Sequence, residues 1–221
     1  MTLHNIYLLS PELSVAILAA VVITVDLMVR NKRILPIIAF VGLLVPLYFS
    51  IQLWDVGPKQ AFSGTFQVDG FGLFFKYLVL GAAALVVLSS IEYARRFGNH
   101  QGEYYALILF SSTGMMLLAS STELITLFVA LELTALPVAA LAAFIRESRS
   151  AESGMKFLVL SAVSSAVLLY GMVLVYGFTG SSQLNEIGFQ ISKPGTDLSP
   201  ALILGIVLIT AGFGFKISAV P

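Results

Sequence analysis

Long apolar runs, each about as long as a membrane-spanning helix, recur along this 221-residue chain. An α-helix needs roughly 20 such residues to cross about 30 Å of hydrocarbon. Lipid offers the backbone no hydrogen-bonding partner, and the runs lack the alternation of barrel strands. We therefore predict an all-α fold, a polytopic transmembrane bundle of about seven helices. The runs lie at residues 11–29, 34–53, 71–91, 104–119, 124–145, 154–178 and from about 198 onward.

The composition supports this class of protein. Apolar residues make up 58% of the chain and charged residues only 11%, against about 45–50% and about 25% in soluble domains. These values exclude a disordered protein, a nucleic-acid binder with a basic face and almost any water-soluble enzyme. The chain has no cysteine, and its two histidines, His4 and His100, lie far apart. We therefore expect no disulfide, no Fe–S cluster, no thiolate zinc site and no histidine metal site in this chain.

The cations predict how the chain is oriented. Asp26 lies inside the first run and no basic segment precedes it, so we expect a retained helix rather than a signal peptide. The alternate loops after the second, fourth and sixth runs hold only Lys59 and Lys193. This bias predicts an outer N-terminus, with ordinary polar connections at 54–70 and 179–200. The remaining loop cations, after the first, third and fifth runs, are Arg30, Lys32, Arg33, Arg95, Arg96, Arg146 and Arg149.

Three lysines remain inside or near the predicted helices. A charge at the bilayer centre costs about 2.5–3.5 kcal/mol on insertion scales, so such side chains usually face protein or water. Lys76 is five residues from the outer start of its helix, where either snorkelling to the headgroups or a functional role fits. Lys156 alone also fits snorkelling. Lys216 stands 16 residues past Pro200, about 24 Å along a straight helix, and is predicted to be buried.

Glu132 is the acid that lies deepest in a run. It is about eight residues from the nearer helix end, too far for a glutamate to snorkel, so we predict a functional carboxylate or, alternatively, a structural one hydrogen-bonded inside the bundle. The other acids near the runs lie within about a turn of a helix end and are predicted to be interfacial: Glu12, Asp26, Glu92 and Glu123.

Helix breakers accompany both candidate residues. Pro137 follows Glu132 by five residues and is predicted to kink its helix. Gly212, Gly214 and Pro221 surround Lys216, and such breakers at membrane depth occur where they are buried in protein or line a hydrated cavity. We therefore predict that the last helix is interrupted near Lys216. A glutamate and a lysine in a dry bundle form either a proton relay operated by geometry or a static ion pair.

Several motifs resemble a known family. The runs EYYAL at 103–107, GMMLLAS at 114–120 and LELTALP at 131–137 resemble the antiporter-like membrane subunits of respiratory complex I. Three further runs resemble subunit N, also called subunit 2, of this complex, the proton-translocating NADH-quinone oxidoreductase. They are ESGMKF at 152–157, SSAVLLYG at 164–171 and FGFKISAVP at 213–221.

The resemblance implies roles for three residues. Glu132 matches the essential glutamate of helix 5 in the family, Lys216 the lysine on the broken helix 7, and Lys156 the helix 6 lysine. All three would act in proton translocation. NADH, FMN, Fe–S clusters and quinone are then expected in partner subunits, with no redox chemistry in this chain. The implied partners are the other membrane and peripheral subunits, and the implied location is the bacterial inner membrane, as a multi-pass protein.

The resemblance also divides the chain. Residues 1–93 would form three N-terminal transmembrane helices, and 94–221 a first antiporter-like repeat, incomplete at its C-terminus because the family has about fourteen helices in two inverted repeats. Two other functions stay open. One is a subunit of a multisubunit cation/proton antiporter, which shares the Glu and Lys plan. The other is a structural membrane scaffold with static charges.

Overall fold

A computed structural model describes residues 3–29, 31–55, 57–145, 147–193 and 199–219. Each of the seven predicted runs is helical over most of its length, which confirms the all-α bundle. Arg30, Arg146 and Pro221, used above for orientation or as a breaker, lie outside the described residues. The helices that form these runs are α2 (Ser10–Met28), α3 (Leu35–Gly42) and α4 (Leu44–Trp54), which together form the second run, α5 (Gly70–Ser89), α7 (Gln101–Ser120), α8 (Leu124–Ala142), α9 (Ser148–Thr179) and α11 (Pro200–Lys216).

Shorter elements lie between these helices. The helices among them are α1 (Leu3–Leu8), α6 (Ile91–Ala94) and α10 (Leu184–Ser192), the strands are β1 (Lys59–Ala61) and β2 (Phe66–Val68), and the 3₁₀ turns are Lys32–Ile34, Phe62–Gly64 and Arg95–His100.

Five stretches of the described chain are long and apolar enough to cross a membrane. The second of them is divided into α3 and α4 at Leu43, where one continuous helix was predicted. The division has a local cause, because Pro46 has no N–H to donate to the carbonyl of Gly42. α11 is apolar but has 17 residues. The five stretches are Ser10–Met28, Lys32–Trp54, Gly70–Ser89, Leu124–Ala142 and Ser148–Thr179.

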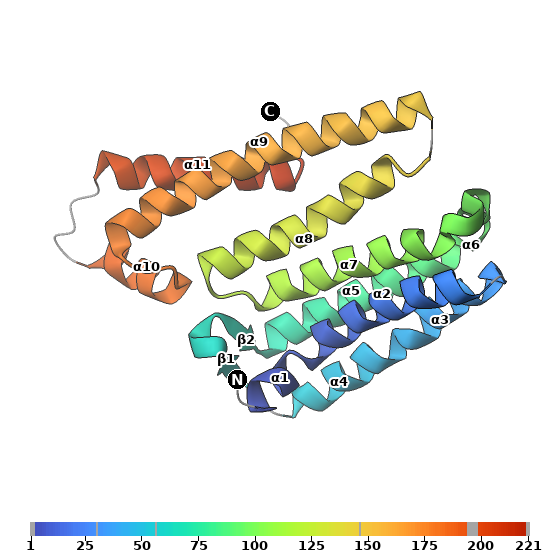
Figure 1. Ribbon diagram of the computed structural model, residues 1–221. Coiled ribbons are helices and arrows are strands. Elements are labelled where there is room, and N and C mark those ends of the chain that lie inside the picture. Colours follow the sequence, from blue (N-terminus) through green and yellow to red (C-terminus); the bar gives the residue numbers. More distant parts are fainter. Residues whose placement is uncertain (1–2, 30, 56, 146, 194–198, 220–221) are drawn as a thin grey trace.

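The helices form two packed groups that meet at α8. Figure 1 shows α2 to α5 and α7 side by side, with α8 next to α7 and the pair α9 and α11 beyond it. The core of the larger group includes Val22, Leu80, Tyr105 and Leu109, each 4% exposed or less. A smaller core around Leu168 and Leu202, both fully buried, joins α9 to α11.

Glycines bring particular helix backbones close together. A Cβ at Gly212 would stand 2.6 Å from the Cβ of Leu168, and one at Gly171 would stand 2.7 Å from the carbonyl oxygen of Gly205. These contacts fix α11 against α9. In the same way a Cβ at Gly114 would stand 2.6 Å from the backbone nitrogen of Thr134, so α7 and α8 touch closely.

The connections at the outer end are more ordered than predicted. We expected ordinary polar loops at 54–70 and 179–200, but β1 and β2 form an antiparallel hairpin, with Lys59 opposite Val68, and the second connection contains α10. In Figure 1 the hairpin, α1 and α10 all lie at one end of the bundle, on the left. We call this end the outer face, in keeping with the cation bias.

Backbone hydrogen bonds tie α8 to α9 at the outer face. The amide of Leu124 donates to the carbonyl of Ser182 at 2.9 Å, and the amide of Leu184 donates to that of Thr122 at 3.0 Å. Thr122 also donates its amide to the carbonyl of Thr65, in the hairpin, at 3.2 Å. The first residues of α8 and the residues after α9 are therefore held together by a short stretch of β-type pairing.

A second tie joins the same helices at the inner end. Ser150 Oγ, in the first turn of α9, donates to the carbonyl of Ala142 at 2.8 Å, at the last residue of α8. Gly154 packs against Ala143, where a Cβ would stand 2.5 Å from the Cβ of the alanine. α8 and α9 are therefore fixed relative to each other at both ends.

Candidate functional site

Glu132 lies near the middle of α8. It is eight residues after the first residue of the helix and ten before the last, about 12 and 15 Å respectively along the axis. Pro137 lies inside the same helix, and the helix continues through it. A side chain does reach the backbone at that point, because Ser111 of α7 donates to the carbonyl of Thr134 at 3.1 Å. α8 is thus fastened to α7 beside the proline.

Lys216 is the last residue of α11. The helix starts with Pro200 in its first turn and Ser199 as its cap, and it ends where the Ile217 amide bonds back to the carbonyl of Phe213. Ser218 then takes a left-handed φ of 55°, which an L-residue adopts rarely. The helix therefore ends directly after Lys216, at the position of the predicted interruption; any continuation of the helix lies outside the described residues. In Figure 1 this end lies about halfway along α9.

The structure brings Glu132 and Lys216 together. Lys216 Nζ is 3.1 Å from Glu132 Oε1, and the side chains are 9% and 24% exposed. The two residues are 84 positions apart in the sequence, on α11 and α8. The geometry is that of an ion pair in the middle of the bundle, partly desolvated on both sides.

Two serines of α9 complete the pair. Ser165 Oγ donates to Glu132 Oε1 at 2.5 Å, and Lys216 Nζ donates to Ser161 Oγ at 3.0 Å. The serines are one helical turn apart, so a single face of α9 presents one hydroxyl to each charged group. Neither serine was predicted as a site residue. The sequence did contain a signal for them: two hydroxyl side chains at i, i+4 spacing in an apolar helix, at about the depth predicted for Glu132.

A pocket of about 580 Å³ adjoins the ammonium group. Lys216, Ser161 and Thr134 supply polar atoms to its wall, and Phe157 and Val138 supply apolar ones. The pocket is roomy enough for water molecules with several polar partners. The pair therefore has a dry side toward the helix contacts and a side that can be hydrated.

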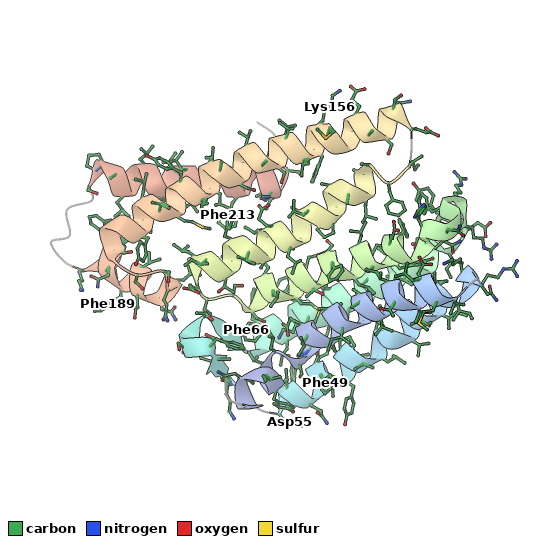
Figure 2. The ribbon with its side chains drawn as sticks, viewed as in Figure 1. Phe49, Asp55, Phe66, Lys156, Phe189 and Phe213 are labelled. Carbon is green, nitrogen blue, oxygen red and sulfur yellow. The ribbon has the colours of Figure 1, made fainter. Side chains whose placement is uncertain are left out.

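Lys156 is not brought to the pair. Its Nζ is 2.5 Å from Glu152 Oε1, four residues earlier on α9, and the two side chains are 71% and 64% exposed. Figure 2 places Lys156 on α9 toward the end opposite α10. It is five residues from Ser161, about 7.5 Å along the helix. Lys156 is thus on the inner side of the pair, separated from it by less than two turns.

Lys76 does not snorkel. Its side chain is fully buried, and Nζ is 2.8 Å from Oε1 of Glu12, which is 2% exposed. The prediction that the Glu12 side chain lies at the membrane interface is therefore wrong, because protein and not water surrounds it. Its distance from the helix end is short, but the side chain turns into the bundle and not toward water.

Asp26 is also buried rather than interfacial. Its Oδ1 is 2.8 Å from Lys32 Nζ, and its side chain is 7% exposed. A Cβ at Gly102 would stand 2.3 Å from the Cβ of Asp26, so the aspartate is pressed against the first turn of α7. Among the described residues no cluster of three or more His, Cys, Asp or Glu side chains could hold a metal ion.

Comparison with known proteins places this geometry in a family. A family described as the transmembrane region of NADH:quinone oxidoreductase and Mrp antiporter subunits matches residues 121–221. Subunit N of NADH-quinone oxidoreductase from Dehalococcoides mccartyi is 39% identical over 219 residues, which is 97% of this chain and 45% of the relative. The same subunit from Moorella thermoacetica is 40% identical over 223 residues, 98% of this chain and 45% of the relative. The chain is a homologue of NADH-quinone oxidoreductase subunit N. It spans somewhat less than half the length of these relatives.

Two solved structures contain chains of similar fold. A chain of respiratory complex I from Thermus thermophilus, with bound aureothin, superposes with a TM-score of 0.76 and 31% identity over 96% of this chain and 44% of that one. A chain of the membrane-bound sulfane sulfur reductase, an archaeal respiratory membrane complex, gives a TM-score of 0.76 at 19% identity. The second likeness concerns the fold alone.

Proposed function

We propose that this subunit N homologue is part of a proton-translocating membrane subunit of a respiratory NADH-quinone oxidoreductase. The observation that carries the proposal is the ion pair between Glu132 and Lys216, at mid-depth, with a serine hydroxyl bonded to each partner. Charges are costly at that depth and usually mark ion or proton pathways. The curated relatives named above are subunits of that enzyme.

The mechanism follows from the contacts. While Lys216 Nζ is bonded to Glu132, both groups keep their charges. If the lysine side chain turns toward the pocket, the carboxylate and the ammonium lose each other's stabilisation, and a proton can pass from lysine to water. During that turn Ser165 can keep its hydrogen bond to the carboxylate, which stays in place, and Ser161 can still accept from the ammonium, because Ser161 also lines the pocket.

Lys156 would supply protons from the inner side. It is exposed, it lies on the same helix as the two serines, and it is closer to the inner end than the pair is. Redox chemistry, with NADH, FMN, Fe–S clusters and quinone, would belong to partner subunits in a bacterial inner membrane. Residues 1–93 would form an N-terminal three-helix unit and 94–221 the first part of an antiporter-like repeat.

A cation/proton antiporter subunit is the second candidate. The family that matches residues 121–221 is described for Mrp antiporter subunits as well as for the oxidoreductase. The two functions predict different partner subunits, because only the oxidoreductase requires redox subunits. Purification of the full-length subunit from membranes therefore separates them: co-purification with redox subunits supports the oxidoreductase, and co-purification with other antiporter chains contradicts it.

The direct test replaces Glu132 by glutamine in the full-length subunit within its membrane complex. Glutamine keeps the shape and the hydrogen bond from Ser165 but removes the charge that faces Lys216. We expect proton uptake driven by NADH oxidation to fall at least about tenfold, about 1.4 kcal/mol, with a parallel loss of coupled quinone reduction. Glu92→Gln is the matched control, since Glu92 is 82% exposed. Unchanged rates in the Glu132 variant would refute the proposal.

A further inference from the structure

A second buried ion pair lies outside the proposed proton route. Glu12 of α2 and Lys76 of α5 are 2% and 0% exposed, with Nζ 2.8 Å from Oε1. The Glu132–Lys216 pair is less buried, at 24% and 9%. Apart from this pair, neither the Glu12 carboxylate nor the Lys76 ammonium has a hydrogen bond to another residue in the described part of the chain. The two pairs therefore differ in kind: one can be hydrated and the other is sealed.

Phe66 closes the sealed pair on the outer side. Lys76 Nζ is 5.1 Å from the centre of the Phe66 ring, within the range of a cation–π contact. Phe66 is 2% exposed and belongs to a buried apolar cluster with Leu8, Leu53 and Leu73. It is the first residue of β2, so the ammonium group touches the hairpin directly. Figure 2 shows Phe66 between the hairpin and the ends of the neighbouring helices.

The hairpin in turn holds the outer ends of two other helices. Phe66 pairs with Ser121, just before α8. Thr122 Oγ1 donates to the carbonyl of Gly64 at 2.6 Å, and Gln183 Nε2 donates to that of Ser63 at 2.8 Å. The residues that precede α8 and follow α9 are therefore both bonded to the hairpin turn.

Glu123 strengthens the same contact. Its two carboxylate oxygens accept hydrogen bonds from Ser182 at 2.6 Å and from Thr126 at 3.0 Å. The start of α8 and the end of α9 are thus joined by side chains as well as by backbone. These are the helices that carry Glu132 and Ser165.

We propose that Lys76, held in place by Glu12, is a positioning residue that anchors the hairpin through Phe66 and so fixes the outer ends of α8 and α9 relative to each other. A sealed ion pair suits this task, because its geometry is specific and a lone buried charge would be strongly unfavourable. The proposal depends on the proposed function only where it predicts a change in the rate of proton uptake. The anchoring itself is measurable without transport.

Hydrogen–deuterium exchange of the intact complex tests the anchor. In Lys76→Met and in Phe66→Leu, we expect the amides of 59–68 and 121–124 to exchange at least about tenfold faster, because each loses the contact between ammonium and ring. Lys59→Met is the matched control, a lysine of the same hairpin whose side chain is exposed, and should leave exchange unchanged. Unchanged exchange in both test variants would overturn the proposal.

Two further measurements separate anchoring from other roles. The charge-swapped double variant, Glu12→Lys with Lys76→Glu, keeps opposite charges but removes the lysine position that faces Phe66. It should therefore loosen the hairpin as Lys76→Met does. Hydrogen–deuterium exchange of the hairpin at the rate of the unmodified protein would overturn the anchoring proposal. The pH profile of proton uptake in Phe66→Leu and Lys76→Met should keep its midpoint while the rate falls a few-fold. A shifted midpoint in Lys76→Met would place Lys76 on the proton route instead and overturn its positioning role.

The outcomes are independent of the Glu132 test. If Glu132→Gln translocates protons normally while Lys76→Met loosens the hairpin, the proposed function fails and the anchor stands. If Lys76→Met does not assemble, Phe66→Leu, which leaves both charges in place, decides by its hairpin exchange alone.

Discussion

At the residue scale, a substitution at Lys216 distinguishes a Glu132–Lys216 pair that switches during proton transfer from one that is static. Lys216→Met keeps an unbranched side chain one atom shorter, removes the charge and leaves Glu132 bonded to Ser165. We expect the complex to assemble, because α11 is held to α9 through Gly205 and Gly212, and proton uptake to fall at least about tenfold. Proton uptake and the amount of assembled complex are measured together.

The control for Lys216 is Lys193→Met. Lys193 is exposed at the end of α10 and bonds to Gln190 on the same helix, so its loss should change neither quantity. A Lys216 variant that assembles poorly, but whose assembled fraction turns over normally, would favour the structural scaffold.

Ser165→Ala removes the hydrogen bond that Glu132 accepts from α9. A hydrogen bond to a charged group contributes about 1.5–3 kcal/mol, so we expect the rate of proton uptake to change by about tenfold or more, without loss of the subunit from the membrane. Ser153→Ala is the control, since Ser153 is exposed and bonds only to its own helix at Arg149. Equal rates in both variants would show that Ser165 does not act on Glu132.

How far residues could be predicted depended on their depth. Glu132 lies far from both ends of its apolar run and Lys216 lies 16 residues past Pro200, so the sequence alone singled them out. Ser161 and Ser165 were missed because serine fits any apolar helix by bonding to its own backbone. Glu12 was misjudged, and the snorkelling alternative for Lys76 failed, because closeness to a helix end does not tell whether a side chain faces water or another helix.

At the element scale, the contact between α9 and α11 depends on glycine. Gly212→Ala would place a Cβ 3.0 Å from the Cα of Leu168 and 2.6 Å from its Cβ, so the helices must separate slightly. We expect a loss of about 1–3 kcal/mol in stability, seen as a lower thermal midpoint of the solubilised complex.

Gly214→Ala is the matched control for that change. It lies on the same helix, two residues on, and a Cβ there meets nothing within 4 Å. Since alanine favours helix over glycine, this variant should be neutral or slightly stabilising. An equal loss in both variants would contradict the prediction, because it would show that the close approach of Gly212 to Leu168 does not set the effect.

The helices were predictable because length and hydropathy determine them locally. The hairpin and α10 were not, because strands of three residues have no periodic signal and are stabilised by partners such as Thr122 and Gln183, distant in the sequence. The division of α3 from α4 could have been read from Pro46, whose missing N–H acts on the preceding turn.

At the scale of the whole molecule, the orientation can be tested with single cysteines, since the chain has none of its own. Lys59→Cys and Asn99→Cys place thiols at exposed positions on opposite ends of the bundle. We expect a membrane-impermeant maleimide to label position 59 from outside and position 99 only after the membrane is opened. The reverse pattern would contradict the predicted outer N-terminus.

The fold class followed from the sequence, but the order of the helices in space did not. Every span is apolar on most of its surface, so hydropathy does not tell which neighbour each face meets. Small residues such as Gly114 and Gly171 decide this, and their partners become visible only when the helices are placed together.

The ties at the two ends of α8 and α9 limit how the residues around Glu132 can move. Two helices joined at both ends can bend near their centres, but they cannot tilt or slide relative to each other. Glu132 and Ser165 lie near that centre, between the pairing at Leu124 and Ser182 and the contact of Ser150 with Ala142. Large swings of α8 relative to α9 are therefore unavailable, and any change in the distance between carboxylate and ammonium must come from side-chain rotation, slight bowing, or movement of α11.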